Sequence, residues 1–293
     1  MHKIIVITGP TAVGKTKLSI ELAKKYDGEI INADAVQVYK GLDIGSAKVT
    51  EEEKEGIPHH LLDFKEVTEE YTIYHYQKDC REKIKDIQSR NKTPILVGGT
   101  GLYIKAALYD YKLSEEKSTN TYDNLTNEEL YEELKKLDKD IIIDKDNRRR
   151  LIRAINYYKE NNESINKNKT NKLLYNVIFI GLTTDRQVLY DIINKRVDEM
   201  ISQGLLEEVK SFYDKGIKSK PLLNAIGYRE LYNYLDGNGT KEEAIEKIKQ
   251  NSRHYAKRQY TFFNHQLPVV WFETDYNNFN NTIEKVASYI DSN

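Results

Sequence analysis

A glycine-rich turn near the start of the chain has the residue types and spacing of a phosphate-binding loop. The sequence GPTAVGKT, residues 9–16, fits the pattern G-x-x-x-x-G-K-[ST] and lies between an apolar run and a segment with helical periodicity. Its backbone N–H groups can face a phosphate at a helix N-terminus, and Lys15 adds a positive charge. The Thr16 hydroxyl can bind Mg²⁺, which prefers oxygen ligands. The expected diphosphate-binding residues are Gly9, Pro10, Thr11, Ala12, Val13, Gly14, Lys15 and Thr16.

A carboxylate, Asp34, follows the next apolar run along the chain. The end of a strand is where ligands bind in α/β sheets, so Asp34 is a candidate for proton transfer or for organising a metal ion. Asp63, at the end of HHLLD, is the alternative residue for the metal role. We do not expect a metal site at His59 and His60, because neighbouring strand residues point to opposite faces.

The elements around these residues follow from alternating apolar runs and amphipathic segments. This alternation is typical of a parallel α/β sheet of the P-loop NTPase type. The expected strands are residues 3–8, 29–34, 59–64 and 94–99, and the expected helices are residues 15–26 and 74–88.

The texture of the sequence changes after residue 111. A charged region with few apolar runs, 112–195, is expected to be a mostly helical insertion, with helices at 127–138 and 147–160 and a loop at 159–172. The run NVIFIGLT at 176–183 resembles a strand that returns to the core. The catalytic core is therefore expected to comprise 1–111 and 196–293, with a helical C-terminal part.

Composition limits the class of protein. The 293 residues carry 45 Lys and Arg against 46 Asp and Glu, so any affinity for nucleic acid must come from local clusters. A single cysteine, Cys80, excludes an intramolecular disulfide, and no apolar stretch reaches membrane-spanning length. The N-terminal residues do not resemble a signal peptide. We expect a cytoplasmic protein with no membrane contact.

Two clusters supply basic charge. Residues 247–258 contain five Lys or Arg and no acid, and Lys249, Arg253 and Lys257 are spaced by four residues, as one stripe of a helix. The second cluster is NRRRLIR, with Arg149 and Arg153 on one face and Arg150 turned partly aside. An isolated charge run is more often a solvated helix face, so these clusters indicate RNA only together with other motifs.

Eight motifs in order give the chain a resemblance to the tRNA dimethylallyltransferase family. They are GPTAVGKT, ADAVQVYKGLDIGSAK, PHHLLD, VGGTGLYIKA, RRRLIRAI, GLLEEV, NAIGYRE and KRQYTFF, and they cover nearly the whole chain. The resemblance implies transfer of a dimethylallyl group from its diphosphate to the exocyclic N6 amine of the adenosine 3′-adjacent to a tRNA anticodon. It also implies Mg²⁺ as cofactor and a monomer that binds the anticodon stem-loop, in part through the insertion at 112–195.

The resemblance assigns roles to individual residues. Asp34 would take the proton of the amine, with Thr100 of GGTG beside it, and both are expected to be catalytic. The sequence departs from the family pattern at Ala35, Asp123, Phe262 and Asn264. The expected tRNA-binding residues are Asp34, Ala35, Val36, Gln37, Arg149, Arg150, Arg153, Gly227, Tyr228, Arg229, Lys249, Arg253, Lys257, Arg258 and Gln259.

Other functions share parts of this pattern. A nucleotide or small-metabolite kinase would bind ATP with the same loop, and an adenylate prenyltransferase would need no RNA surface. A non-catalytic RNA-binding protein with a vestigial loop would not need Lys15 and Asp34, which are both present. The role of Asp34 also stays open between catalytic base and metal organiser.

Overall fold

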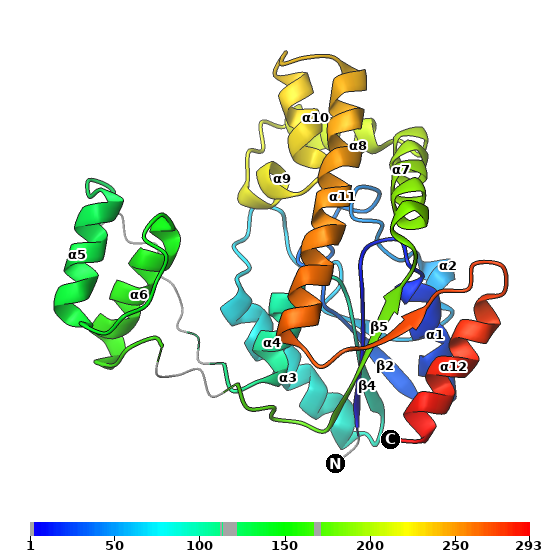
Figure 1. Ribbon diagram of the computed structural model, residues 1–293. Coiled ribbons are helices and arrows are strands. Elements are labelled where there is room, and N and C mark those ends of the chain that lie inside the picture. The colour runs from blue at the N-terminus through cyan, green and yellow to red at the C-terminus, as the bar shows by residue number, and fades with distance from the viewer. Residues whose placement is uncertain (1–2, 112, 114–121, 167–170) are drawn as a thin grey trace. The chain divides into compact units, whose positions relative to one another are not determined.

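The core of the protein is a six-stranded sheet in which every strand pairing is parallel (Figure 1). A computed structural model describes residues 3–111, 113, 122–166 and 171–293. The strand order is β3-β2-β4-β1-β5-β6. The strands are β1 (Ile4–Thr8), β2 (Gly28–Asn32), β3 (His59–His60), β4 (Thr93–Val97), β5 (Val177–Thr183) and β6 (Val270–Glu273).

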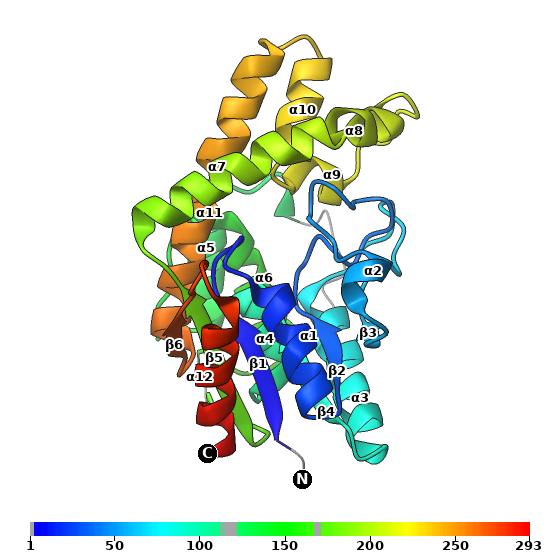
Figure 2. The ribbon, with the colours of Figure 1, turned by 90° about the vertical axis from the view of Figure 1, so that its right-hand side faces the viewer.

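Helices cover both faces of this sheet. On one face α1 (Lys15–Lys25) and α12 (Phe279–Asp291) lie side by side, and their apolar residues join those of the strands in one core (Figure 2). The other face carries α3 (Ile73–Ser89) and α4 (Gly101–Leu108) (Figure 1). The central strands are buried on both sides, which explains why β1 is apolar almost throughout.

A group of helices lies beyond the carboxyl ends of the strands (Figure 1). The long helix α11 runs from this group down to the sheet, where Ala256 joins the core. Its position gives the strand ends a helical wall. The helices are α7 (Arg186–Ser202), α8 (Leu205–Tyr213), α9 (Lys220–Asn224), α10 (Tyr228–Leu235) and α11 (Lys241–Gln266), and the short α2 (Glu51–Lys54) precedes β3.

A second compact unit comprises Leu108–Leu174. It contains α5 (Asn127–Leu137) and α6 (Arg148–Asn161), whose apolar faces pack on each other through residues such as Leu130, Leu134 and Leu151. Arg148 donates hydrogen bonds to the carbonyl oxygens of Tyr122 and Leu125 and ties the start of α6 to the segment before α5. This unit therefore has its own small core.

The sequence-based expectations for the elements are largely confirmed. The parallel α/β core, the five anticipated strands and the helices at α1, α3, α5 and α6 are present. The unit boundaries differ from the expected 112–195, because β5 and α7 belong to the first unit. Of the expected loop at 159–172, residues 167–170 lie outside the described part of the chain, as do 112 and 114–121 of the insertion.

One strand was not expected from the sequence. β6 pairs with β5 at the sheet edge, although the C-terminal third is dominated by helical periodicity. Its apolar run, PVVWF, is short and follows directly on the longest helix. Within the described residues no helix is long and apolar enough to cross a membrane.

A buried carboxylate provides a test of the sheet. Glu29 on β2 has a 4% exposed side chain and accepts hydrogen bonds from Arg90 (Nη2 to Oε2, 2.9 Å), with His60 Nε2 2.7 Å from Oε2. The Arg90 guanidinium, with a smaller contribution from His60, lowers the pKa of Glu29 from 4.5 to about 2. The ionised form therefore stabilises the fold above pH 4.5, and this contribution is lost as the pH falls toward 2.

We predict that Glu29→Gln lowers the free energy of unfolding at pH 7, because the ion pair with Arg90 is lost. The expected loss is about 1–2 kcal/mol, a modest value because Arg90 is partly exposed and solvent screens the pair. The deficit should shrink below pH 4.5, as urea unfolding at pH 7, 4.5 and 3.5 would measure. Glu66→Gln, in an exposed pair with Lys40, is the control and should leave the urea midpoint unchanged. An equal deficit at all three pH values would contradict the role of the charge.

Candidate active site

A cavity of about 1160 Å³ opens at the carboxyl ends of the strands. Its walls come from the loop after β1, from the segment after β2, from α7 and from α11. This position is the one at which ligands bind in open α/β sheets. The polar lining includes Thr11, Lys15, Thr16, Asp34, Gln37, Ser46, Arg196, Arg229, Asn251, Tyr255, Arg258 and Gln259.

The loop at 9–16, termed the P-loop, is held by side chains from the C-terminal third of the chain. Gln259 on α11 accepts from the Thr11 backbone N–H at 3.2 Å and donates to the Gly99 carbonyl oxygen at 3.0 Å. Thr274 donates to the Val13 carbonyl oxygen at 3.0 Å. These contacts fix the backbone from which N–H groups would face a phosphate.

Two cations meet at the P-loop. Lys15 Nζ donates to the Pro10 carbonyl oxygen at 2.5 Å, and Arg196 Nη1 on α7 donates to Thr11 Oγ1 at 3.3 Å. Burial, reinforced by the positive charge of Arg196 and partly offset by Asp34, lowers the pKa of Lys15 from 10.5 to about 7. Burial also lowers the pKa of Arg196. A bound polyanion would restore favourable interactions to both groups.

Asp34 lines the same cavity in a fixed loop, and its charge acts on both Lys15 and Arg196. Its Oδ1 accepts from the Val36 N–H at 2.8 Å, and the Asn32 side chain bonds both the N–H and the carbonyl of Asp34. Thr100 braces the same segment, since its Oγ1 accepts from the Ala35 N–H at 3.1 Å. The geometry therefore brings Asp34, Thr100 and the P-loop to one place, as expected from the sequence.

Tyr255 completes this group and was not identified from the sequence. Its hydroxyl contacts Thr100 and Gln259, and burial together with the charge of Asp34 raises its pKa to about 12. The phenol therefore stays protonated and can donate a hydrogen bond. Arg196 was also missed, because it reaches Thr11 from 185 residues away and lies in an ordinary amphipathic helix.

The expected RNA-binding stripe on α11 is not continuous. Lys249 pairs with Asp198 at 2.8 Å and has a 15% exposed side chain, and Arg253 Nη1 donates to Asn194 Oδ1 at 2.5 Å. Both side chains therefore join α11 to α7. Lys257 and Arg258 are exposed, at the end of the helix near the sheet.

Two further residues of the expected tRNA-binding set, Gln259 and Tyr228, have buried side chains. Gln259 is 5% exposed and holds the P-loop, and Tyr228 is fully buried and donates to Glu208. Gln259 belongs to the cavity lining, whereas Tyr228 does not. Gly227 and Arg229 line the cavity, as do Val36 and Gln37, whereas Arg149, Arg150 and Arg153 belong to α6 of the second unit.

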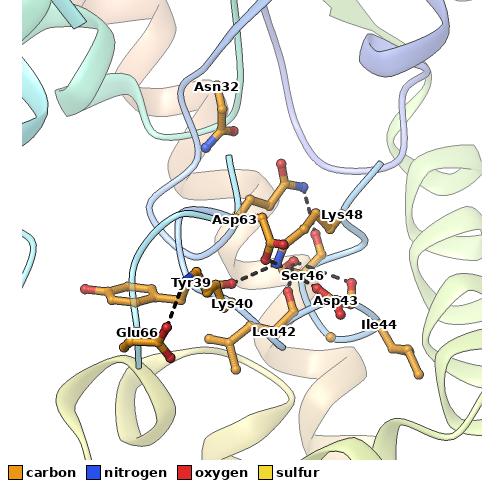
Figure 3. Close-up of polar contacts among 12 residues, drawn as sticks. Asn32, Tyr39, Lys40, Leu42, Asp43, Ile44, Ser46, Lys48, Asp63 and Glu66 are labelled. Atoms are coloured by element: carbon orange, nitrogen blue, oxygen red, sulfur yellow. Dashed lines mark hydrogen bonds and ion pairs between the residues drawn. The ribbon is translucent and has the colours of Figure 1, made fainter. Parts of the chain in front are cut away.

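The alternative metal residue Asp63 is engaged elsewhere. Its Oδ1 accepts from Lys48 Nζ at 2.5 Å, in a network outside the cavity lining (Figure 3). His60 contacts Glu29, and His59 Nδ1 lies 2.8 Å from the Ile57 carbonyl oxygen. The described residues contain no group of three His, Cys, Asp or Glu side chains suited to a metal ion. Asp63 is therefore an ion-pair partner of Lys48.

The Thr16 hydroxyl and the Asp34 carboxylate are two hard oxygen donors in the lining of the cavity. Magnesium is commonly held by one or two such groups together with substrate phosphates, so this donor set fits Mg²⁺. The fold, the P-loop and the acidic group at the next strand define a P-loop protein that acts on a phosphorylated ligand.

Comparisons with known proteins define the family. The IPP transferase family matches residues 37–266. A tRNA dimethylallyltransferase of Anoxybacillus flavithermus is 50% identical over 300 residues, which cover 99% of this chain and 96% of that protein. A relative with the same name from Geobacillus thermodenitrificans is 49% identical over 303 residues, 99% of this chain and 96% of that protein. The chain belongs to the IPP transferase family.

Solved structures agree with this assignment. The crystal structure of a tRNA delta(2)-isopentenylpyrophosphate transferase from Staphylococcus epidermidis superposes with a TM-score of 0.77 at 40% identity, covering 100% of this chain and 99% of that one. A eukaryotic dimethylallyltransferase acting on tRNA gives a TM-score of 0.88 at 30% identity, over 100% of this chain and 79% of that one.

The lowered pKa of Lys15 predicts proton uptake on ligand binding. At pH 8 the amine is largely neutral in the empty site, and a bound pyrophosphate would raise its pKa. Calorimetry in two buffers of different ionisation enthalpy should show uptake of up to about one proton per site beyond that of Lys15→Arg, whose guanidinium is always charged. Equal uptake by the two proteins would contradict the prediction.

Proposed function

We propose that the protein transfers a dimethylallyl group from dimethylallyl diphosphate to the exocyclic N6 amine of the adenosine 3′-adjacent to the anticodon of a tRNA, and releases pyrophosphate. The observation that carries this proposal is a single cavity that joins Lys15 and Arg196 to Asp34. The full-length similarity to tRNA dimethylallyltransferases supports it. The phosphate held by the P-loop would then be a leaving group rather than one that is transferred.

Departure of pyrophosphate needs positive charge near its oxygens. The P-loop N–H groups, Lys15 and Arg196 face the cavity where that charge would grow as the carbon–oxygen bond breaks. Magnesium, held by the Thr16 hydroxyl and the diphosphate, would add Lewis-acid stabilisation of the leaving group.

The acceptor amine is a weak nucleophile because its lone pair is delocalised into the adenine ring. As the nitrogen–carbon bond forms, the nitrogen loses a proton, and Asp34, a carboxylate of the cavity lining, is proposed to accept it. Thr100 holds the Asp34 segment through the Ala35 N–H, and the Tyr255 hydroxyl contacts Thr100 in turn. We assign Asp34 as the base and Thr100 and Tyr255 as groups that orient it.

Access of a loop adenosine requires that the base leave its stack, which costs less in a single-stranded loop than in a helix. The exposed Lys257 and Arg258 lie near the cavity, and Arg149, Arg150 and Arg153 on α6 add charge in the second unit. These residues are proposed to contact the RNA backbone. We further propose that the protein works as a monomer in the cytoplasm.

A prenyl-transfer assay tests the proposed function. The protein is incubated with dimethylallyl diphosphate, Mg²⁺ and an anticodon stem-loop with adenosine at the 3′-adjacent position. Mass spectrometry should show one dimethylallyl group on that nucleoside, with release of an equal amount of pyrophosphate. A stem-loop with guanosine there is the control. An unmodified adenosine, or transfer of phosphate from ATP to a small metabolite instead, would contradict the proposal.

Substitution of Asp34 separates its two possible roles. Asp34→Asn keeps the shape but removes the base, so the rate constant should fall about 10²-fold or more while both Michaelis constants change little. A magnesium series should not restore the rate. Asp27→Asn, at the opposite end of β2 and paired with Lys92, is the matched control. Recovery of the rate at high magnesium would assign Asp34 to metal binding.

A further inference from the structure

The segment that follows Asp34 forms a loop whose tip lines the cavity. Gly45, Ser46 and Ala47 belong to the cavity lining, and Lys48 ends this turn (Figure 3). Lys48 has a 6% exposed side chain and donates to the Tyr39 carbonyl oxygen at 2.8 Å and to the carboxylates of Asp43 and Asp63. The Lys48 side chain therefore joins the two ends of this loop.

A carboxylate from a helix that is distant in the sequence also binds the backbone of this loop. Glu208 on α8 accepts three backbone N–H groups in succession. Its Oε2 accepts from Asp43 at 3.1 Å and from Ile44 at 2.8 Å, and its Oε1 accepts from Gly45 at 3.1 Å. The Tyr228 hydroxyl also donates to Oε1. One side chain therefore connects the cavity loop with α8 and α10.

The fit around this carboxylate is close. A Cβ atom on Gly45 would lie 2.5 Å from Cε2 of the Tyr228 ring, so only glycine allows the loop to approach this ring so closely. Tyr228 is fully buried, and burial together with the charge of Glu208 raises its pKa. The phenol therefore remains a donor, and all four partners of Glu208 are N–H or O–H groups.

The loop is linked by hydrogen bonds to the proposed base, whereas no hydrogen bond among the described residues joins it directly to the P-loop. Gln37 donates its side-chain amide to the carbonyl oxygens of Ser46 (3.0 Å) and Ala47 (3.2 Å), and its backbone N–H lies 3.4 Å from Asp34 Oδ1. The chain of contacts runs from Glu208 through the loop and Gln37 to Asp34. The P-loop is held separately, by Gln259 and Thr274.

We infer that Glu208 is a positioning residue for the RNA acceptor: it fixes the wall of the cavity against which the adenosine is oriented toward Asp34. The inference rests on the proposed function. Loss of this anchor should impair use of the acceptor and leave binding of the diphosphate intact. A residue needed only for folding would not separate the two substrates in this way.

The test compares Glu208→Gln with Glu207→Gln, the exposed neighbour on the same helix. In Glu208→Gln an amide group replaces one acceptor oxygen, so two of the four donors lose their partner. We expect kcat/KM for the stem-loop to fall about 10-fold or more, with KM for dimethylallyl diphosphate and Kd for pyrophosphate within about twofold of the unmodified protein. Tyr228→Phe removes one donor only, and its loss should be smaller and in the same direction.

Thermal melting of each variant sets an assay temperature at which it is folded, and Glu207→Gln should match the unmodified protein. Unchanged use of the stem-loop by folded Glu208→Gln and Tyr228→Phe would overturn the positioning role alone. A parallel loss of pyrophosphate affinity would overturn it as well, because the effect would then reach the P-loop. Failure of the wild-type protein to prenylate RNA would instead contradict the proposed function, on which the positioning role of Glu208 rests.

Discussion

The close approach of three parallel strand ends is the constraint on which the site depends. Thr8 at the end of β1 donates to the Gly98 carbonyl oxygen at 3.1 Å, and the Ala33 N–H after β2 donates to the Val97 carbonyl oxygen at 2.8 Å. A Cβ atom on Gly98 would collide with the Ala33 backbone. This convergence sets the starting points of the P-loop, the Asp34 segment and the Thr100 turn, and so brings their side chains to one cavity.

The charges of this cavity are divided by function. Lys15 and Arg196 lie at the P-loop and are destabilised by burial, so their positive charge is best compensated when a polyanion binds. Asp34 lines the same cavity, in a segment anchored through Gln37 to the loop that Glu208 holds. The P-loop and the Asp34 segment have different anchors. One cavity can therefore hold a diphosphate and also orient the RNA acceptor.

Residues that follow strand ends could be predicted from the sequence, because strand periodicity and a local motif locate them. Lys15, Asp34 and Thr100 are of this kind. The roles of Arg196 and Glu208 could not be predicted, since each reaches its partner across more than 160 residues. Arg196 lies in an ordinary helical pattern, and the motif GLLEEV, which contains Glu208, does not reveal the loop that Glu208 binds. The spacing of basic residues on α11 was also insufficient to predict an RNA-binding stripe, because spacing does not reveal that Lys249 is paired with Asp198.

The most direct measurement of the central claim is a crystal structure with Mg²⁺ and a non-cleavable thio analogue of dimethylallyl diphosphate. The account predicts that the two phosphates contact the P-loop N–H groups, Lys15 and Arg196, and that the carbon bearing the leaving group faces Asp34. Phosphates bound outside the P-loop, or a dimethylallyl group directed away from Asp34, would contradict it.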